Sequence, residues 1–274
     1  MPRSESVAPR IPQDTIPPKH KLSVSGLTVS YATRGKSVTP FADVNFEVQD
    51  GEFICIIGPS GAGKSTLLFA LAGLVAPTAG TIELAGRQIN GPGGDRAVVF
   101  QDDAVFPWYT VEKNVAYAPA AAGWPAAERE RAVEESLRLV GLSDRRKSYP
   151  GQLSGGMRKR VDVARAFAGD PETILMDEPF GGLDTMTKEG LQESILQIWD
   201  TKKKTIIFVT HDLEEAAFLA DRVFVLQKGG GLRIVPIDLP RPRTATMRTE
   251  PALQSYRRML GELIRGAEMV ADGH

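Results

Sequence analysis

Cysteine is nearly absent from this sequence, since its 274 residues include only Cys55. No disulfide can form within such a chain, which suits a reducing compartment such as the cytoplasm. Cys55 lies in the apolar run Phe53–Ile57. A thiol in such a run is expected to be buried and inert rather than redox-active.

Long apolar runs are also missing. A membrane-spanning helix needs roughly 18 to 20 apolar residues in a row, and the alanine-rich segment 116–127 is interrupted by Pro119 and Pro125. The chain is therefore not expected to cross a membrane. The first twenty residues contain five prolines and several charges but no apolar signal-peptide core. We expect residues 1–20 to be a disordered leader.

Neither sign of charge is in excess, because 33 basic residues are balanced by 34 acidic residues and the net charge is -1. Such a chain has no overall positive field to attract the phosphates of DNA or RNA. Nucleic-acid binding is therefore not expected. The 42% hydrophobic content is ample for a buried core.

What the sequence does contain is an ordered change of hydrophobic pattern. Residues 22–48 alternate loosely and predict antiparallel strands joined by a turn around Arg34–Lys36. Short apolar strands then alternate with helices, which predicts a parallel α/β core, and a helical insertion at about 102–168 interrupts the alternation. The further strands expected are 52–57, 81–84, 96–101, 173–176, 205–210 and 222–226, and the helices expected are 64–74, 111–118, 126–142, 155–168, 188–199 and 213–220.

This pattern divides the chain after its leader into two parts. Residues 21–235 are expected to form one α/β domain that carries the helical insertion. Residues 236–274 are expected to form an extension with a helix near 251–264. The arginines of the connection before that helix are expected to be solvated rather than to form a binding patch.

A phosphate-binding loop follows the first core strand. Residues 58–65 read Gly58-Pro59-Ser60-Gly61-Ala62-Gly63-Lys64-Ser65 and fit the pattern G-x-x-x-x-G-K-[ST] between a strand and a helix. The glycines let several backbone N–H groups point into one concavity, and the helix adds its positive end. Lys64 is expected to reach the β- and γ-phosphates of ATP and Ser65 to ligate Mg²⁺, with Thr66 among the nucleotide-binding residues. The flanking elements disfavour the alternative, a glycine turn without a ligand.

Two acids end another apolar strand. Asp177 and Glu178 follow Ile174–Met176 and should emerge at the carboxyl end of that strand, where α/β sheets bind nucleotides. Asp177 is expected to hold the Mg²⁺ shell. Glu178 is expected to accept a proton from the attacking water as a general base.

With these motifs the sequence resembles the ABC ATPase family. Leu153-Ser154-Gly155-Gly156-Met157 resembles the family's signature sequence, and it precedes the Asp177-Glu178 strand as in that family. Gln101 matches the Q-loop, Gly182-Leu183-Asp184 the D-loop and His211 the switch histidine. The resemblance covers nearly all of residues 22–228. It implies a P-loop NTPase core with an antiparallel β subdomain and an inserted α-helical subdomain.

The resemblance also implies a site shared by two copies of the chain. Ser154–Gly156 would open a helix whose free N–H groups hold an ATP bound to the P-loop of the second copy, and Asp184 belongs to the same nucleotide-binding set. Gln101 would sense Mg²⁺ and the attacking water, and His211 would contact the γ-phosphate. Tyr31 resembles the aromatic that stacks on adenine, with simple packing an equal alternative.

Two positions depart from the family pattern. Met157 stands where the family usually has glutamine, and Gly181-Gly182 replaces a commoner Ser-Ala pair. Because the backbone of the signature is unaffected by Met157, activity is expected to survive. The change nevertheless leaves a second hypothesis open: an ATP-dependent dimerising regulatory module without productive turnover.

Other P-loop classes fit the sequence less well. A DNA-repair ATPase of the coiled-coil type would separate the P-loop from the signature by long heptad arms, whereas a compact helical segment intervenes here. A translation-associated ABC protein would normally carry two cassettes. A GTPase would need an N-K-x-D element, which the sequence lacks.

The segment after the Q-loop narrows the class further. Residues 98–115, with Pro107-Trp108, are similar to importer ATPases for nitrate, sulfonate and taurine, and residues 86–93 look nearest to the taurine importers. Phe106 and Trp108 are expected to line the groove that receives a helix of the membrane subunit, with core packing as the alternative.

The expected function is therefore that of an ATP-hydrolysing importer subunit on the cytoplasmic face of the membrane. Its expected partners are a second copy of itself, transmembrane permease subunits and, indirectly, a solute-binding protein. The ATPase does not touch the solute, so its residues cannot encode which solute is carried.

Overall fold

The central sheet is built from strands that read as continuous apolar runs. β3 (Phe53–Ile57), β7 (Thr173–Asp177) and β8 (Thr205–Val209) are buried at every residue, as expected for parallel strands covered on both faces. The computed structural model describes residues 20–33 and 36–272. Residues 1–19 of the expected leader and residues 34–35 of the expected turn therefore lie outside the described residues.

Six strands form this sheet in the order β10-β9-β3-β8-β7-β6. β6 (Arg96–Val99) and β9 (Arg222–Leu226) run parallel to their neighbours β7 and β3, and β10 (Leu232–Pro236) pairs antiparallel at the edge. The sheet buries Cys55 completely, which confirms the sequence prediction. Burial also raises the pKa of this thiol well above its usual value, so it stays protonated.

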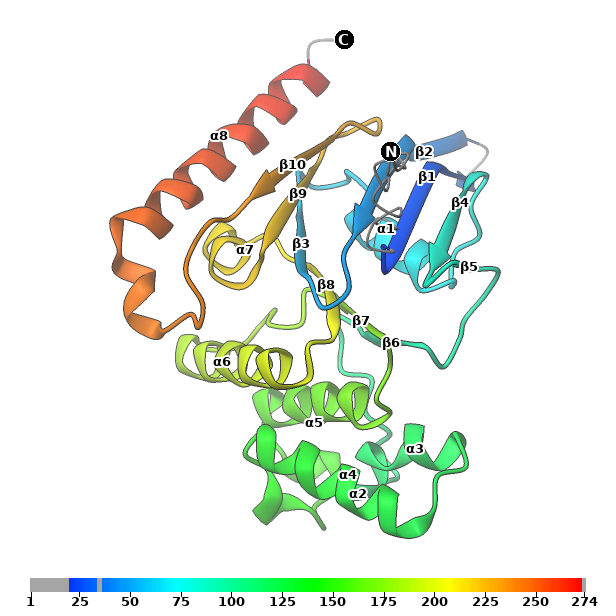
Figure 1. Ribbon diagram of the computed structural model, residues 1–274, viewed down its shortest axis with the longest axis vertical. Helices are drawn as coiled ribbons and strands as arrows, with labels where there is room; N and C mark the ends of the chain where they lie inside the picture. Colours follow the sequence, from blue (N-terminus) through cyan, green and yellow to red (C-terminus); the bar gives the residue numbers. More distant parts are fainter. Residues whose placement is uncertain (1–19, 34–35, 273–274) are drawn as a thin grey trace, which may run out of the picture.

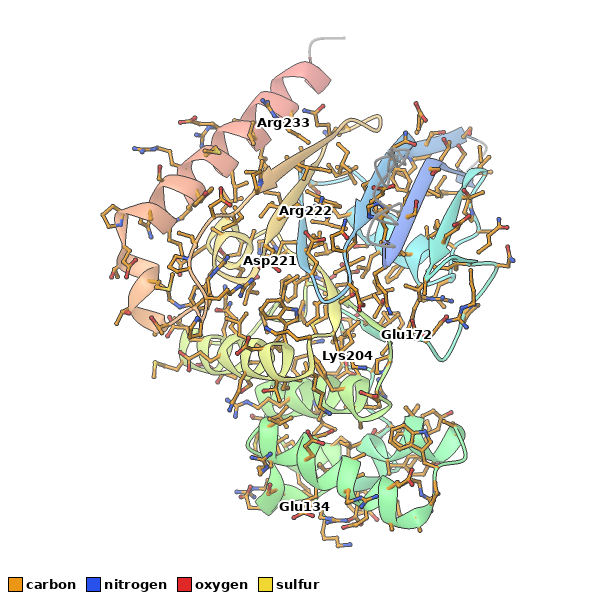
Figure 2. The ribbon with its side chains drawn as sticks, viewed as in Figure 1. Glu134, Glu172, Lys204, Asp221, Arg222 and Arg233 are labelled. Atoms are coloured by element: carbon orange, nitrogen blue, oxygen red, sulfur yellow. The ribbon has the colours of Figure 1, made fainter. Side chains whose placement is uncertain are left out.

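A second sheet, of four antiparallel strands, covers one side of this core. β1 (Leu22–Thr33), β2 (Lys36–Val48), β4 (Ala79–Leu84) and β5 (Arg87–Gln88) have the order β2-β1-β4-β5. One hydrophobic cluster joins the sheet, the helix α1 (Lys64–Leu71) and one face of the central sheet. Figure 1 shows these strands beside α1, away from the helical part of the molecule. Lys21, just before β1, pairs with Glu172, just before β7, at 2.8 Å. This ion pair ties the two sheets together, and Figure 2 labels Glu172.

The segment between the two core strands β6 and β7 is helical, as the sequence predicts (Figure 1). Its helices are α2 (Val111–Val115), α3 (Tyr117–Ala121), α4 (Ala126–Leu139) and α5 (Gly155–Ala168). The single helix predicted over residues 111–118 is instead two short helices that meet at Ala116. The buried Asn114 side chain donates to the carbonyls of Phe106, Tyr109 and Thr110, and so holds the loop that precedes α2.

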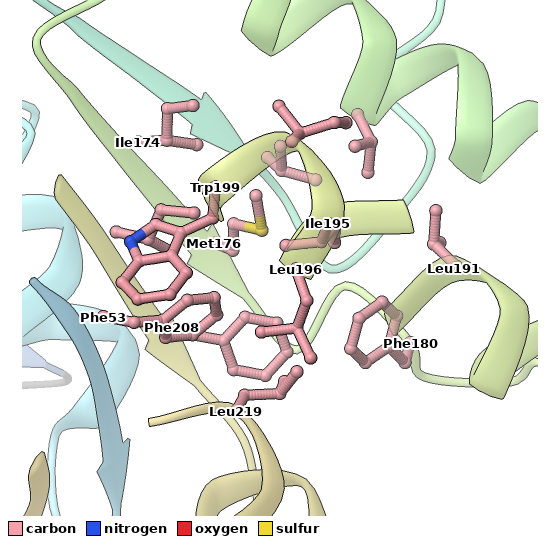
Figure 3. Packing of buried hydrophobic residues seen from close by; sticks show 14 of the residues in the cluster. Phe53, Ile174, Met176, Phe180, Leu191, Ile195, Leu196, Trp199, Phe208 and Leu219 are labelled. Carbon is pink, nitrogen blue, oxygen red and sulfur yellow. The ribbon is translucent and has the colours of Figure 1, made fainter. Parts of the chain in front are cut away.

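Two helices cover the other face of the central sheet. α6 (Thr185–Lys202) is longer than the predicted helix, and α7 (Leu213–Leu219) follows β8. Figure 3 shows α6 packed on the strands through Trp199, whose ring meets Phe53 edge-on at a centroid distance of 6.0 Å. The Trp199 indole N–H donates to the Gly51 carbonyl at 3.0 Å, so this large side chain is buried without an unsatisfied donor.

The C-terminal extension ends in α8 (Pro251–Asp272), which begins where predicted and continues past the predicted end. The expectation that the arginines before α8 are solvated is wrong. Arg243 is buried and donates to the carbonyls of Ala217, Phe218 and Ala220 at the end of α7. The last carbonyls of a helix have no partner within it, so they attract a cation that charge patterning alone assigns to the surface.

The α/β class predicted from the sequence is confirmed by this arrangement. The antiparallel sheet, the parallel core and the helical part between β6 and β7 are all present among the described residues. In that part of the chain, no helix is both long enough and apolar enough to span a bilayer.

Candidate nucleotide-binding site

Four strand ends meet at one edge of the central sheet. β3, β8, β7 and β6 are neighbours in that order and run parallel, so their carboxyl ends lie on the same side. The P-loop follows β3, His211 follows β8, Glu178 follows β7 and Gln101 follows β6. Residues separated by more than one hundred positions are thereby brought together where α/β sheets bind ligands.

The P-loop needs its glycines because neighbouring strands crowd it. Gly63, the residue before α1, has φ of 91°, and a Cβ there would lie 2.7 Å from Pro40 Cβ. A Cβ at Gly58 would lie 2.3 Å from the Leu226 carbonyl oxygen. Any larger residue would push the loop off β2 and β9, so the cradle shape depends on these two positions.

Lys64 lies over the loop that it follows. Its Nζ donates to the carbonyls of Gly58 at 3.0 Å and Pro59 at 3.1 Å. Burial lowers the pKa of Lys64, although the negative charges of Glu178 and Asp177 oppose this shift. The loop therefore carries one partly desolvated cation beside a row of backbone N–H groups, an arrangement suited to a polyphosphate.

Ser65 and Asp177 form the hard-oxygen pair of the site. Ser65 Oγ donates to Asp177 Oδ1 at 3.0 Å. Burial raises the pKa of Asp177, and the hydrogen bond from Ser65 works against this shift. Mg²⁺ favours a hydroxyl and a carboxylate completed by phosphate oxygens and water, so the two side chains fit this ion.

Glu178 is held in an unusual backbone conformation. Its φ of 42° lies in the left-handed region, which costs a non-glycine residue about 1–2 kcal/mol. The strain is offset locally because its N–H donates to the Val209 carbonyl at 3.0 Å. The Glu178 carboxylate accepts from Gln101 Nε2 at 3.4 Å and lies 3.0 Å from His211 Nδ1. The three side chains assigned separately from the sequence thus form one cluster beside the P-loop.

The signature segment forms a separate helix start. Ser154 caps α5, since its hydroxyl accepts from the Met157 N–H at 3.3 Å. This cap uses the backbone of Met157 and not its side chain, which packs against the core. Gly156 lies against α6, where an added Cβ would be 2.6 Å from Thr187 Cγ2. Within residues 20–33 and 36–272, no hydrogen bond or ion pair joins Ser154–Gly156 to the P-loop, so the signature helix start and the P-loop are separate elements of the chain.

The remaining residues predicted from the sequence lie at the surface. Asp184 is exposed and caps α6 by accepting from the Thr187 N–H at 3.0 Å. Tyr31 is 45% exposed in β1, two residues beyond Val29, whose partner Phe41 packs against Gly63. Among the described residues, no hydrogen bond links Tyr31 to the P-loop, so its assignment to adenine depends on the resemblance alone.

One buried cation near the site was not anticipated. Lys159 in α5 donates its Nζ to the carbonyls of Phe100 at 2.6 Å and Gln101 at 2.9 Å. It therefore ties the helix of the signature to the backbone that carries the Gln101 side chain. Burial lowers the pKa of Lys159. Nothing in the sequence distinguishes this lysine from the neighbouring Arg158 and Arg160, which are partly exposed.

An aromatic group lies on the helical part of the chain. Trp108 is 67% exposed and stacks on Phe106 at a centroid distance of 5.7 Å. The Phe106 ring also contacts the guanidinium of Arg165, 5.1 Å from its centre, and the ring of Tyr117. Simple core packing therefore does not account for Trp108.

Comparison with known proteins places the chain in a family. Residues 41–181 match the ABC transporter family. A nitrate import ATP-binding protein of Synechocystis sp. is 41% identical, over 90% of this chain and 96% of that protein. A bicarbonate transport ATP-binding protein of the same organism is 44% identical, over 82% of this chain and 83% of that protein.

A solved structure matches the fold as well. It is the dimeric post-hydrolysis state of an ATP-binding cassette bound to ADP and phosphate, with a TM-score of 0.71 and 30% identity over 80% of this chain and all of that chain. The fold and the P-loop site define an ATPase of the ATP-binding cassette class. This chain belongs to the ABC transporter family and is one of its ATP-hydrolysing subunits.

Proposed function

We propose that this chain energises an importer for a small solute of the nitrate, sulfonate and taurine class. The observation that carries the proposal is the convergence of Glu178, Gln101 and His211 beside the P-loop. ATP hydrolysis needs the phosphates to be held, a water to be oriented and a base to receive its proton. This edge of the sheet offers a side chain for each task.

In this proposal each residue has a defined role. Lys64 and the P-loop amides hold the phosphates, and Ser65, Asp177 and Gln101 hold Mg²⁺. The bound ion would offset negative charge on the phosphates. Glu178 accepts the proton of the attacking water, with the position of its carboxylate set by the strained backbone and its two neighbours. His211 contacts the γ-phosphate.

Two copies of the chain are proposed to share two ATP molecules. Each P-loop would face the Ser154–Gly156 helix start of the other copy, and Asp184 and Tyr31 would complete the nucleotide contacts. Two observations support this arrangement: the separation of the two anion-binding elements within one chain, and the dimeric state of the matched cassette. A head-to-tail pair with twofold symmetry satisfies both elements at once.

The proposed permease contact is the aromatic group around Trp108. An exposed, rigidly supported tryptophan is a typical anchor for a partner helix. Docking there would hold the chain at the cytoplasmic face of the membrane, with a solute-binding protein acting through the permease. Nitrate and bicarbonate transport by two relatives supports a small solute, and binding assays on the cognate solute-binding protein identify which one.

The proposal is tested by separating hydrolysis from binding. Glu178→Gln keeps the shape of the side chain and removes its proton-accepting charge, so steady-state phosphate release with the cognate permease should fall about 10²- to 10⁴-fold. Nucleotide should still bind, and MgATP should shift the purified chain from monomer to dimer in light scattering. Lys64→Ala should instead weaken nucleotide binding and prevent the dimer.

Wild-type turnover in Glu178→Gln, or a dimer no stronger than that of Lys64→Ala, would show that these assignments are wrong. The wild-type chain in the same assay tests the regulatory-module hypothesis motivated by Met157. Sustained phosphate release contradicts that hypothesis, and a stable ATP-bound dimer without release supports it.

A further inference from the structure

Four side chains beside the site form a closed polar network between α6 and α7. We call Lys188, Thr210, Asp212 and Glu215 the α6–α7 network. Lys188 lies in the first turn of α6, and its Nζ is 2.6 Å from Asp212 Oδ2 and 2.7 Å from Glu215 Oε1. The buried Glu215 accepts a hydrogen bond from the Thr210 hydroxyl, which in turn accepts from the Asp212 N–H at 3.0 Å.

This network brackets one residue of the proposed site. Thr210 and Asp212 are the chain neighbours of His211, and both are held through their side chains. The His211 side chain itself is 72% exposed, and its hydrogen-bond partner in the structure is Glu178. An exposed ring is not held by packing, so its place beside Glu178 depends on the backbone on either side of it.

Lys188 is the part of the network that comes from another element. Asp212 also caps α7 by accepting from the Glu214 N–H at 2.9 Å, so the start of that helix and the His211 backbone move together. Without this cation, the neighbouring carboxylates of Asp212 and the buried Glu215 would have no ion-pair partner among the described residues. Their repulsion would act directly on residues 210–212.

We propose that Lys188 is a positioning residue for ATP hydrolysis. It pairs with both Asp212 and Glu215 and thereby holds the 210–212 backbone so that His211 stays beside Glu178. This inference rests on the role proposed above for His211. It assigns Lys188 no contact with the nucleotide, so its effect belongs to the chemical step and not to ATP binding.

The test is the rate of phosphate release by the chain with its cognate permease, as a function of ATP concentration. Lys188→Met should lower kcat about 10- to 100-fold, because a displacement of about 1 Å at a reacting group costs up to about 10²-fold. KM for ATP should change little. Lys188→Arg should retain most of the wild-type kcat, since a guanidinium can bind two carboxylates. Thr210→Val, which leaves the ion pairs intact, should also lower kcat.

A matched control is available on the same helix. Lys202 ends α6, its side chain is 21% exposed against 26% for Lys188, and it pairs with Glu135 at 3.4 Å away from the site. Lys202→Met should keep the wild-type kcat. Binding of a fluorescent ATP analogue to every variant verifies that its fold is intact. If Lys188→Met does not fold, the inference is tested by the lowered kcat expected for Thr210→Val and the nearly wild-type kcat expected for Lys188→Arg.

A double-mutant cycle separates positioning from general destabilisation. If Lys188 acts through His211, Lys188→Met should cause no further loss of kcat in a His211→Ala background. Independent, multiplying losses would overturn the inference. Wild-type kcat in Lys188→Met, with slow turnover in His211→Ala, would overturn the inference alone. Wild-type kcat in His211→Ala would overturn the proposed role of His211 together with the inference.

Discussion

Removal of the buried Arg243 guanidinium is expected to destabilise the protein, although two opposing effects must be weighed. Arg243 is 7% exposed and donates to the carbonyls of Ala217, Phe218 and Ala220 at 2.8 to 2.9 Å. Each buried carbonyl left without a donor costs about 1–3 kcal/mol, so Arg243→Met would cost about 3–9 kcal/mol from these groups.

The opposing effect is the desolvation of the charge itself. Burial lowers the pKa of Arg243 to about 10, which corresponds to about 3 kcal/mol for holding the cation in this environment. Arg243→Met relieves that cost and keeps most of the aliphatic stem. The unsatisfied carbonyls outweigh the relief, and we expect a net loss of about 3 kcal/mol in the free energy of unfolding.

Thermal unfolding followed by circular dichroism measures this loss. A chain of this size loses about 2–4 °C in Tm per kcal/mol, so Tm should fall by about 6–12 °C. Arg257→Met, on the exposed face of α8, is the matched control and should change the free energy of unfolding by less than about 0.5 kcal/mol. An unchanged or raised Tm for Arg243→Met would refute the reasoning, because desolvation would then dominate the hydrogen bonds.

Two further predictions concern the site and its partner surface. Asp177→Asn should raise Tm at pH 7, because burial raises the pKa of Asp177 and so penalises its charged form in the folded protein. The same substitution should lower hydrolysis by at least about 10²-fold. The gain in Tm should shrink as the pH falls through the folded-state pKa and vanish below the unfolded-state value, because the wild-type carboxyl is then protonated; a pH series of melts checks this. Trp108→Ala should leave Tm and ATP binding unchanged but weaken co-purification with the permease, and undiminished co-purification would contradict the docking role of the aromatic group.

Much of the fold follows from local features of the sequence. The fully buried strands β3, β7 and β8 are short apolar runs, and such runs bounded by loops predict a covered parallel sheet. Helix ends are less predictable because packing decides them. Neither the break at Ala116 nor the extension of α8 to Asp272 is marked by the local sequence pattern.

The sequence alone was sufficient to single out the residues for which we propose phosphate chemistry. The P-loop spacing, the two acids that end a strand and the Ser-Gly-Gly start of a helix each express a local requirement, namely free N–H groups or a carboxylate at a strand end. Only the tertiary structure decided how these residues meet. The strand order β3-β8-β7-β6 places His211 and Gln101 against Glu178. Burial turns Arg243 and Lys159 from apparent surface charges into internal ties, and the packing of α6 against α7 pairs Lys188 with Asp212 and Glu215. Neither outcome can be inferred from a local pattern, because strand order and burial depend on contacts between residues far apart in the chain.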